Sequence, residues 1–231
     1  MKLPDILNDD HIDAAAKLLS AYYRLTTAGL PAYTGSLFNS WACGGDASDV
    51  VNRVTADDLI AVSFLAVDIP GEAAFGILET YASLISDLLA QIPADLDMAK
   101  MNGNDFDKLL GEDSPTLQLW HVLRGRVTGR WGMGETRTSK LMARKRPRLI
   151  PIYDSIVGPM MGLETGSLGQ WQRWHTALTD GTVPPQRLQE IFRASGISDP
   201  ISDIRVMDIV LWMYGKQHPE SADVPQTLRA N

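Results

Sequence analysis

Apolar residues recur at intervals of three and four along most of this chain, and almost no segment alternates apolar with polar residues. Spacings of three and four place side chains on one face of a helix, whereas alternation is typical of strands. The segment from His11 to Leu25 shows the pattern clearly, with apolar side chains at Ile12, Ala15, Leu18, Leu19 and Tyr22. The sequence therefore predicts an all-α fold of about ten helices.

Capping residues and prolines predict where several of these helices begin. Thr55 precedes two acidic residues and is placed to cap an apolar helix over Leu59–Val67. Ser114 precedes Pro115, which suits the first position of the helix leading to residue 124. We expect further helices over Ala73–Ile92, Asp105–Leu110, Ile156–Met161, Leu168–Leu178, Pro185–Ala194 and Ile201–Tyr214.

The length and apolar content of the chain bound its domain organisation. With 231 residues, 45% of them apolar, the chain can bury a substantial core. We expect one helical domain over residues 1–217, which can divide into two lobes of about residues 1–113 and 114–217. Residues 218–231 then form a polar C-terminal tail.

Composition excludes several classes of protein. The single cysteine, Cys43, rules out an internal disulfide and a cysteine-rich metal or iron–sulfur site. His121 and His175 have no partner at metal-ligand spacing, so we expect no metal and no cofactor. No apolar run is long enough for a membrane span, and the N-terminal segment MKLPDILNDD lacks a signal-peptide core, which predicts a cytoplasmic protein with no membrane contact.

Positive charge is concentrated in one part of an acidic chain. Nine of the 21 Lys and Arg residues lie between residues 124 and 148, where Glu135 is the only acid, while the chain as a whole has a formal charge of −7. Such a concentration predicts a polyanionic partner. The nine are Arg124, Arg126, Arg130, Arg137, Lys140, Arg144, Lys145, Arg146 and Arg148.

The same part of the chain contains Gly132-Met133-Gly134 between two predicted helices. Two glycines allow a tight turn whose N–H groups can approach an anion, and the helix that starts at Glu135 directs its free N–H groups the same way. The spacing fits a helix-hairpin-helix that clamps a phosphate backbone. A plain corner between two helices, with a glycine linker, would show the same local sequence.

Twenty positions after Gly134, the segment Pro151-Ile152-Tyr153-Asp154-Ser155-Ile156-Val157 places an aspartate at a helix start. Over about residues 115–160 the chain thus resembles the helix-hairpin-helix DNA glycosylase superfamily, with the hairpin at the junction of two helical lobes. A closer likeness, to uncharacterised bacterial proteins that share the SKLMARKRPRLIPIYD core, implies no activity. The resemblance implies double-stranded DNA as the partner, bound by Gly132, Met133, Gly134, Arg137, Lys140, Arg144 and Lys145.

The resemblance also implies that Asp154 is the catalytic carboxylate of a hydrolase that releases a damaged or modified base. A carboxylate near the sugar can stabilise the oxocarbenium-like transition state and orient water. Asp154 can equally be a helix cap, and the two roles are compatible. Thr136 stands where lyase members of the superfamily have a lysine, so we expect a monofunctional enzyme; Lys140, one turn further on, would face phosphate or solvent.

An extruded base needs a pocket with stacking partners. The aromatic candidates closest to the motif are Tyr153, Trp131, Trp171 and Trp174, with Trp41 and Tyr33 further away in the sequence. Trp131 stands next to Arg130 where superfamily hairpins often have Leu-Pro, and it can pack under the hairpin or stack on a base. For Trp171 and Trp174, core packing is the competing interpretation.

Two other functions remain compatible with the sequence. One is a non-catalytic helix-hairpin-helix module that binds nucleic acid and uses Asp154 only as a cap. The other is docking of an acidic protein on Arg144–Arg148. Arg205 and Asp208, three positions apart in the last predicted helix, indicate an ordinary ion pair on a helix.

Overall fold

The computed structural model of the chain describes residues 3–126, 129, 131–163, 166–167 and 169–219. Within these residues there are eleven α-helices and no β-strand, which confirms the all-α prediction. Arg130, Leu168 and the tail from residue 220 onward lie outside the described residues. The helices are α1 (Ile12–Tyr23), α2 (Ala56–Ser63), α3 (Gly71–Phe75), α4 (Ala82–Ala90), α5 (Gly103–Leu110), α6 (Pro115–Leu123), α7 (Glu135–Lys145), α8 (Val157–Met160), α9 (Gln170–Thr179), α10 (Pro185–Ser195) and α11 (Asp203–Gln217).

The two predicted caps are present. Thr55 accepts a hydrogen bond from the N–H of Asp58, and the Asp58 carboxylate accepts one from the N–H of Thr55, which makes a complete capping box at the start of α2. Ser114 caps α6 through the N–H of Leu117, and Pro115 occupies the first turn. Both helices therefore begin where their sequences predict.

The single long helix predicted over Ala73–Ile92 is wrong. The segment forms α3, a π-helical turn at Gly76–Thr80 and then α4, with a bend of 68° across the break. The indole of Trp131 packs so closely on Gly76 that a Cβ there would lie 2.2 Å from the ring. A tertiary contact that the local sequence does not encode accompanies the irregular turn.

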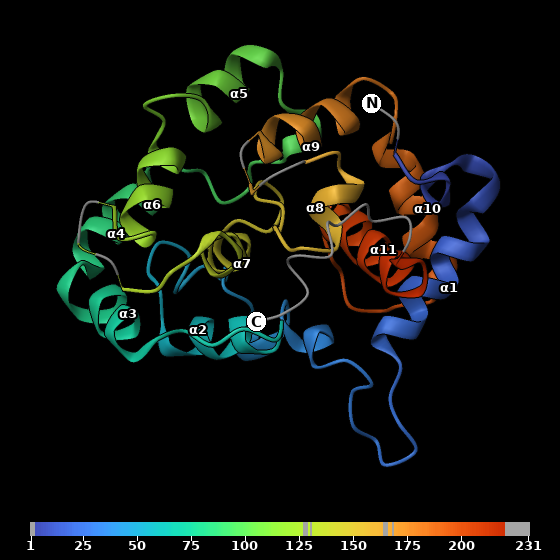
Figure 1. Cartoon of the computed structure of the whole chain (residues 1–231), viewed down its shortest axis with the longest axis horizontal. Helices are drawn as coiled ribbons and strands as arrows, with labels where there is room; N and C mark the ends of the chain where they lie inside the picture. The colour runs from blue at the N-terminus through green and yellow to red at the C-terminus, as the bar shows by residue number, and fades with distance from the viewer. Residues whose placement is uncertain (1–2, 127–128, 130, 164–165, 168, 220–231) are drawn as a thin grey trace.

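Helix α7 lies in the middle of the fold, with α2, α3, α4 and α6 on one side and α1, α8, α10 and α11 on the other (Figure 1). The N-terminal helix α1 packs against α10 and α11, whereas α6 packs against α4, α5 and α7. Contacts between helices therefore cross the predicted boundary at residue 113, and the division into two lobes stays a prediction.

The central position of α7 is unexpected for its sequence, ETRTSKLMARK, which is rich in polar residues. Every residue of α7 from Thr138 to Lys145 is buried, including its three cations after Arg137. Buried charges require partners inside the protein, so the buried cations of α7 must have partners there.

None of the helices in the described ranges is by itself long and apolar enough to cross a bilayer; only the bent pair Gly71–Thr80 and Ala82–Ala90 has the necessary length and composition together.

Candidate functional site

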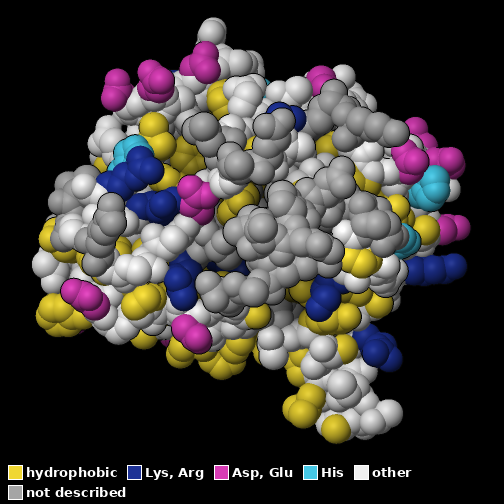
Figure 2. Space-filling view, viewed as in Figure 1, with side chains coloured by type: hydrophobic (Ala, Val, Ile, Leu, Met, Phe, Trp, Pro, Cys, Tyr) yellow, Lys and Arg dark blue, Asp and Glu magenta, His cyan; other side chains and the backbone are white. Residues whose placement is uncertain are grey.

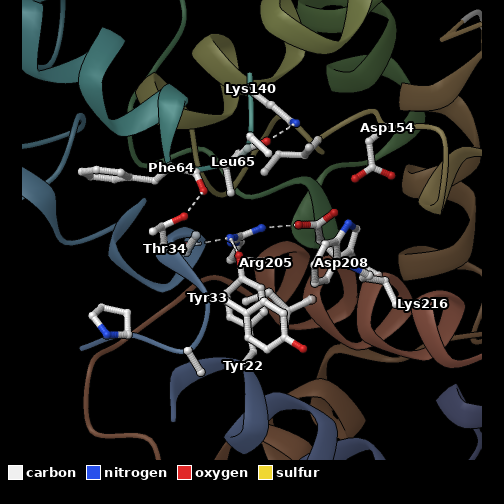
Figure 3. Close-up of a pocket in the computed structure, with 17 residues that line it drawn as sticks. Tyr22, Tyr33, Thr34, Phe64, Leu65, Lys140, Asp154, Arg205, Asp208 and Lys216 are labelled. Carbon is white, nitrogen blue, oxygen red and sulfur yellow. Dashed lines mark hydrogen bonds and ion pairs between the residues drawn. The ribbon is translucent and has the colours of Figure 1, made fainter. Parts of the chain in front are cut away.

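A cavity of about 350 Å³ lies between α7, α11, the end of α1 and two loops at residues 31–35 and 64–66 (Figure 3). Its volume is near the lower end of the range of about 300–1,000 Å³ that is usual for small-ligand sites. Two carboxylates, three cations and four aromatic rings line it. The charged groups are Asp154, Asp208, Lys140, Arg205 and Lys216, and the rings are Tyr22, Tyr33, Phe64 and Trp212.

Asp154 is half-buried at the start of the segment that leads to α8, and it faces the cavity. Its Oδ1 accepts hydrogen bonds from the N–H groups of Ile156 (2.9 Å) and Val157 (2.8 Å). No described residue donates to its Oδ2. The carboxylate is therefore held in one orientation by two backbone donors, and one oxygen remains available to a ligand.

The second carboxylate, Asp208, is almost completely buried and pairs with Arg205 on the same helix. Burial raises the pKa of Asp208 to about 6; Arg205 opposes this shift and the charge of Asp154 adds to it. Arg205 also donates to the Tyr22 hydroxyl and to the Gly35 carbonyl. The pair thus connects α11 to α1 and to the loop that forms one wall of the cavity.

Lys140, the only α7 residue in the cavity lining, is 6% exposed. Its ammonium donates to the carbonyl oxygen of Leu65 at 2.7 Å, and Figure 3 shows it on the same side of the cavity as Asp154. Burial lowers the pKa of Lys140; the charges of Asp154 and Asp208 oppose the shift, and Arg205 adds to it. The prediction that Lys140 faces phosphate or solvent is therefore wrong.

Three of the aromatic rings, those of Tyr22, Tyr33 and Trp212, form the opposite wall. Tyr22 and Tyr33 are stacked, with ring centroids 5.4 Å apart and planes 6° from parallel. Trp212 meets both rings edge-on, and the ammonium of Lys216 lies 5.0 Å from the centre of the Trp212 ring. A flat ligand that enters the cavity would have these rings on one side, with Arg205 and Lys216 next to them, and Lys140 and Asp154 on the other.

The sequence cluster of cations does not form a surface cluster. Arg144 is 2% exposed and Lys145 is 1% exposed, and both donate to the buried Asp58, each at 3.1 Å. Arg144 also donates to the carbonyls of Phe38, Asn39 and Trp41, and Lys145 to that of Val50. The prediction that Arg144 and Lys145 bind a DNA backbone is wrong because both are buried and donate to groups inside the protein. Lys140 is buried too, and its ammonium lies at the cavity and not on the outer surface.

Arg146 is also buried and hydrogen-bonded inside the protein. It is 2% exposed and donates to the carbonyl oxygens of Val51, Leu89 and Ile92. On the face drawn in Figure 2 some Lys and Arg side chains lie next to one another at the left and the others are scattered, with acidic side chains among them, so no large cationic surface is seen there. The docking of an acidic protein on Arg144–Arg148 is therefore excluded for all of these cations except the half-buried Arg148.

The turn at Gly132–Gly134 is partly as predicted. Gly132 has a φ of +79° and Gly134 a φ of −73°; both glycines are exposed, whereas the Met133 side chain is buried between them. Arg137 donates to the carbonyls of Gly132 and Asp68, so it holds the turn in place. Within the described residues, the N–H groups of Glu135, Thr136 and Arg137 have no hydrogen-bond acceptor.

None of the four aromatic residues suggested for a base pocket lines the cavity. Trp131 is buried under the turn and donates to the Leu123 carbonyl, and Trp174 is fully buried in the core. Trp171 packs edge-on against Trp120, and the ring of Tyr153 lies against Gly158. These assignments are corrected to core and near-core packing, while Tyr33, which is distant in sequence, does line the cavity.

The sequence matches DUF6308, a family of unknown function, over residues 15–215. The chain belongs to this family. No curated protein and no solved structure gave a match. In this DUF6308 chain the match begins within α1 and ends within α11. It therefore includes part or all of each helix and loop that forms the cavity wall.

Sequence reasoning missed most of the cavity of this DUF6308 protein. Arg205 and Asp208 form the ion pair on a helix that their spacing indicates, but both are also buried and line the cavity, which the spacing does not predict. A signal was present: the two charges interrupt the otherwise apolar run IRVMDIVLWM of α11. In the described part of the chain, no three His, Cys, Asp or Glu side chains lie close enough together to hold a metal ion.

Proposed function

We propose that this protein is a monofunctional hydrolase that releases a damaged or modified base from DNA by cleaving its N-glycosidic bond. The observation that carries the proposal is Asp154, fixed through one oxygen and open through the other, at the edge of an aromatic-lined cavity.

The chemistry follows from the position of the carboxylate. Cleavage of a glycosidic bond develops positive charge on the sugar, which a nearby carboxylate stabilises, and the same group can take a proton from the attacking water. The two backbone donors fix Asp154 before the substrate arrives, so little reorganisation accompanies the reaction. The base itself would occupy the cavity beside the ring of Tyr33.

A duplex keeps its bases stacked inside, so the enzyme must hold the backbone while one nucleotide is extruded. The exposed turn and the three free N–H groups at the start of α7 suit a phosphate. Lys140 lies six residues beyond Gly134, about 9 Å along the helix axis. The segment from Leu65 to Pro70 runs between the two places, since Lys140 binds the Leu65 carbonyl and Arg137 binds the Asp68 carbonyl.

The experiment is release of free base from a panel of duplexes that carry damaged and modified bases. Wild-type protein should release at least one base, and Asp154→Asn should release none. Asparagine keeps an oxygen that can accept from the N–H groups of Ile156 and Val157, so the variant should fold and bind DNA as the wild type does. Asp107→Asn, on the exposed face of α5, is the matched control and should keep full activity.

A second candidate function is a non-catalytic module that binds nucleic acid. The cap that Asp154 provides for the N–H groups of Ile156 and Val157 favours it, because this role needs no reaction. Duplex binding by the wild type without release of any base would select the module. Full activity of Asp154→Asn would eliminate Asp154 as the catalytic group.

A further inference from the structure

The Lys140 ammonium has hydrogen-bond donors that its single contact with a described acceptor does not use. An ammonium group has three N–H donors, and that of Lys140 uses one of them, on the carbonyl oxygen of Leu65. No other described residue accepts from it, although the side chain is 94% buried, as its exposed fraction of 6% shows. Burial of a charge with unused donors is costly unless water or a ligand in the cavity supplies the missing acceptors.

The unused donors belong to the same cavity as Asp154. Among the charged groups around Lys140, Asp154 has the largest influence on its pKa, followed by Asp208 on α11 and then Arg205. Figure 3 shows Lys140 and Asp154 on the same side of the cavity, with Tyr22 and Tyr33 on the other side. A base between these walls would present its ring nitrogens and oxygens to Lys140 and its sugar to Asp154.

We infer that Lys140 is a second catalytic residue, the general acid that protonates the departing base. This inference rests on the proposed function and assigns a role that a glycosidic cleavage needs but that Asp154 does not supply. When the bond between the sugar C1′ and the base nitrogen breaks, its electron pair stays on the base. A neutral base would then leave as an anion, and proton transfer from the Lys140 ammonium makes it a neutral product.

The proton balance closes within the cavity. Water adds to C1′ and gives one proton to Asp154, while Lys140 gives one proton to the base and becomes a neutral amine. Transfer of the proton from Asp154 to Lys140, directly or through a water molecule, restores both groups. Burial lowers the pKa of Lys140, which makes its ammonium a stronger acid and the transfer to the base easier.

The test compares two leaving groups. One duplex contains 2′-deoxyinosine, whose neutral base needs a proton to leave, and the other contains N7-methyl-2′-deoxyguanosine, whose base is already positive and leaves without one. Lys140→Met keeps the apolar stem and removes the acid. It should slow release of hypoxanthine by about 100-fold or more, the usual size of general-acid catalysis, and should leave release of N7-methylguanine nearly unchanged.

The comparison is internal to one variant, so partial unfolding would slow both reactions equally and cannot imitate the result. Lys108→Met, an exposed lysine on α5, is the matched control and should release both bases as the wild type does. Equal slowing of the two reactions by Lys140→Met, or wild-type release of N7-methylguanine alone, would overturn the general-acid role while leaving the hydrolase in place.

Two further results are decisive. If the wild type releases neither of these two bases, nor a base from any other duplex of the panel, both the proposed hydrolase activity and this inference are refuted. Covalent trapping of the wild type on DNA by borohydride that is lost in Lys140→Met would show an imine at Lys140, and the residue would then be a nucleophile and not a proton donor. Trapping that persists in Lys140→Met would place the imine on another lysine.

Discussion

The burial of Asp58 leads to the sharpest prediction about stability. Its carboxylate, 1% exposed, faces the Nε of Arg144 and the Nζ of Lys145, each at 3.1 Å, and also accepts from the Thr55 backbone N–H. Asp58→Asn keeps the shape of the side chain but leaves two buried cations without a counter-charge. Loss of one partner from a buried ion pair costs about 3–5 kcal/mol, so we expect the free energy of unfolding to fall by about 4 kcal/mol.

The assay is equilibrium unfolding in urea, followed by circular dichroism at constant pH and salt. The midpoint should fall while the slope with urea stays constant, because the surface exposed on unfolding is the same. Asp57→Asn is the matched control: Asp57 lies in the same first turn of α2, is exposed, and among the described residues accepts only from the Trp41 indole. Its loss should cost less than about 1 kcal/mol.

Equal, small effects of the two substitutions would refute the argument. Arg144 and Lys145 would then not depend on Asp58, and their side chains could reach solvent. In that case the interpretation of the sequence cluster as a cationic surface would return.

Two further predictions concern other buried contacts. Burial raises the pKa of Asp208 to about 6, so this group stabilises the folded state most below about pH 4, and the stabilisation is lost as the pH rises through about 6. The loss is worth about 3 kcal/mol between these two limits. Asp208→Asn should remove this loss from the pH dependence of the free energy of unfolding. A wild-type and a variant profile with the same slope between pH 4 and 6 would contradict it. Gly45→Ala should destabilise the protein by about 1–3 kcal/mol in the urea assay, because its Cβ would lie 2.5 Å from the Arg144 carbonyl oxygen. The control Gly103→Ala, whose Cβ would point into open space, should not lower the stability. A Gly45→Ala variant as stable as the wild type would show that the loop around Gly45 is not held against α7.

Those helix starts that depend only on residues nearby in the sequence could be predicted. The capping box at Thr55 and the Ser114-Pro115 start depend on residues within one turn, and both are present. The break between α3 and α4 accompanies the packing of Trp131 on Gly76, a contact between residues 55 positions apart. No pattern in the neighbourhood of Gly76 carries that information, so the sequence predicted a continuous helix.

The candidate site divides in the same way. Asp154 was found because its motif is local, and the structure puts it in a cavity lining. The cations of α7 were misinterpreted because their partners, among them Asp58 and the Phe38 carbonyl, are 86 and 106 residues away. Charge clustering in a sequence has the same appearance whether the charges face solvent or hold distant loops, and only the fold distinguishes the two cases.

Burial of these cations changes what the surface offers to DNA. Five cations and two aspartates are buried among the described residues, which removes a net charge of +3 and leaves −10 on the rest of the chain, whose formal total is −7. If the protein binds a duplex as proposed, the attraction then comes mainly from the backbone amides of Glu135, Thr136 and Arg137. Each phosphate neutralised by a cation contributes about 0.9 to the slope of log affinity against log salt, so nine surface cations would give a slope near −8.

With Lys140, Arg144, Lys145 and Arg146 buried, five of the nine cations remain, so we expect a slope no steeper than about −4.5. It can be measured by fluorescence anisotropy of a labelled duplex over a range of salt concentrations. Arg126→Ala, which removes an exposed cation before the turn, should reduce that slope by about one unit. Lys108→Ala, remote on α5, should leave it unchanged. A slope near −8 would mean that Lys140, Arg144, Lys145 and Arg146 contact phosphate, which is incompatible with their burial.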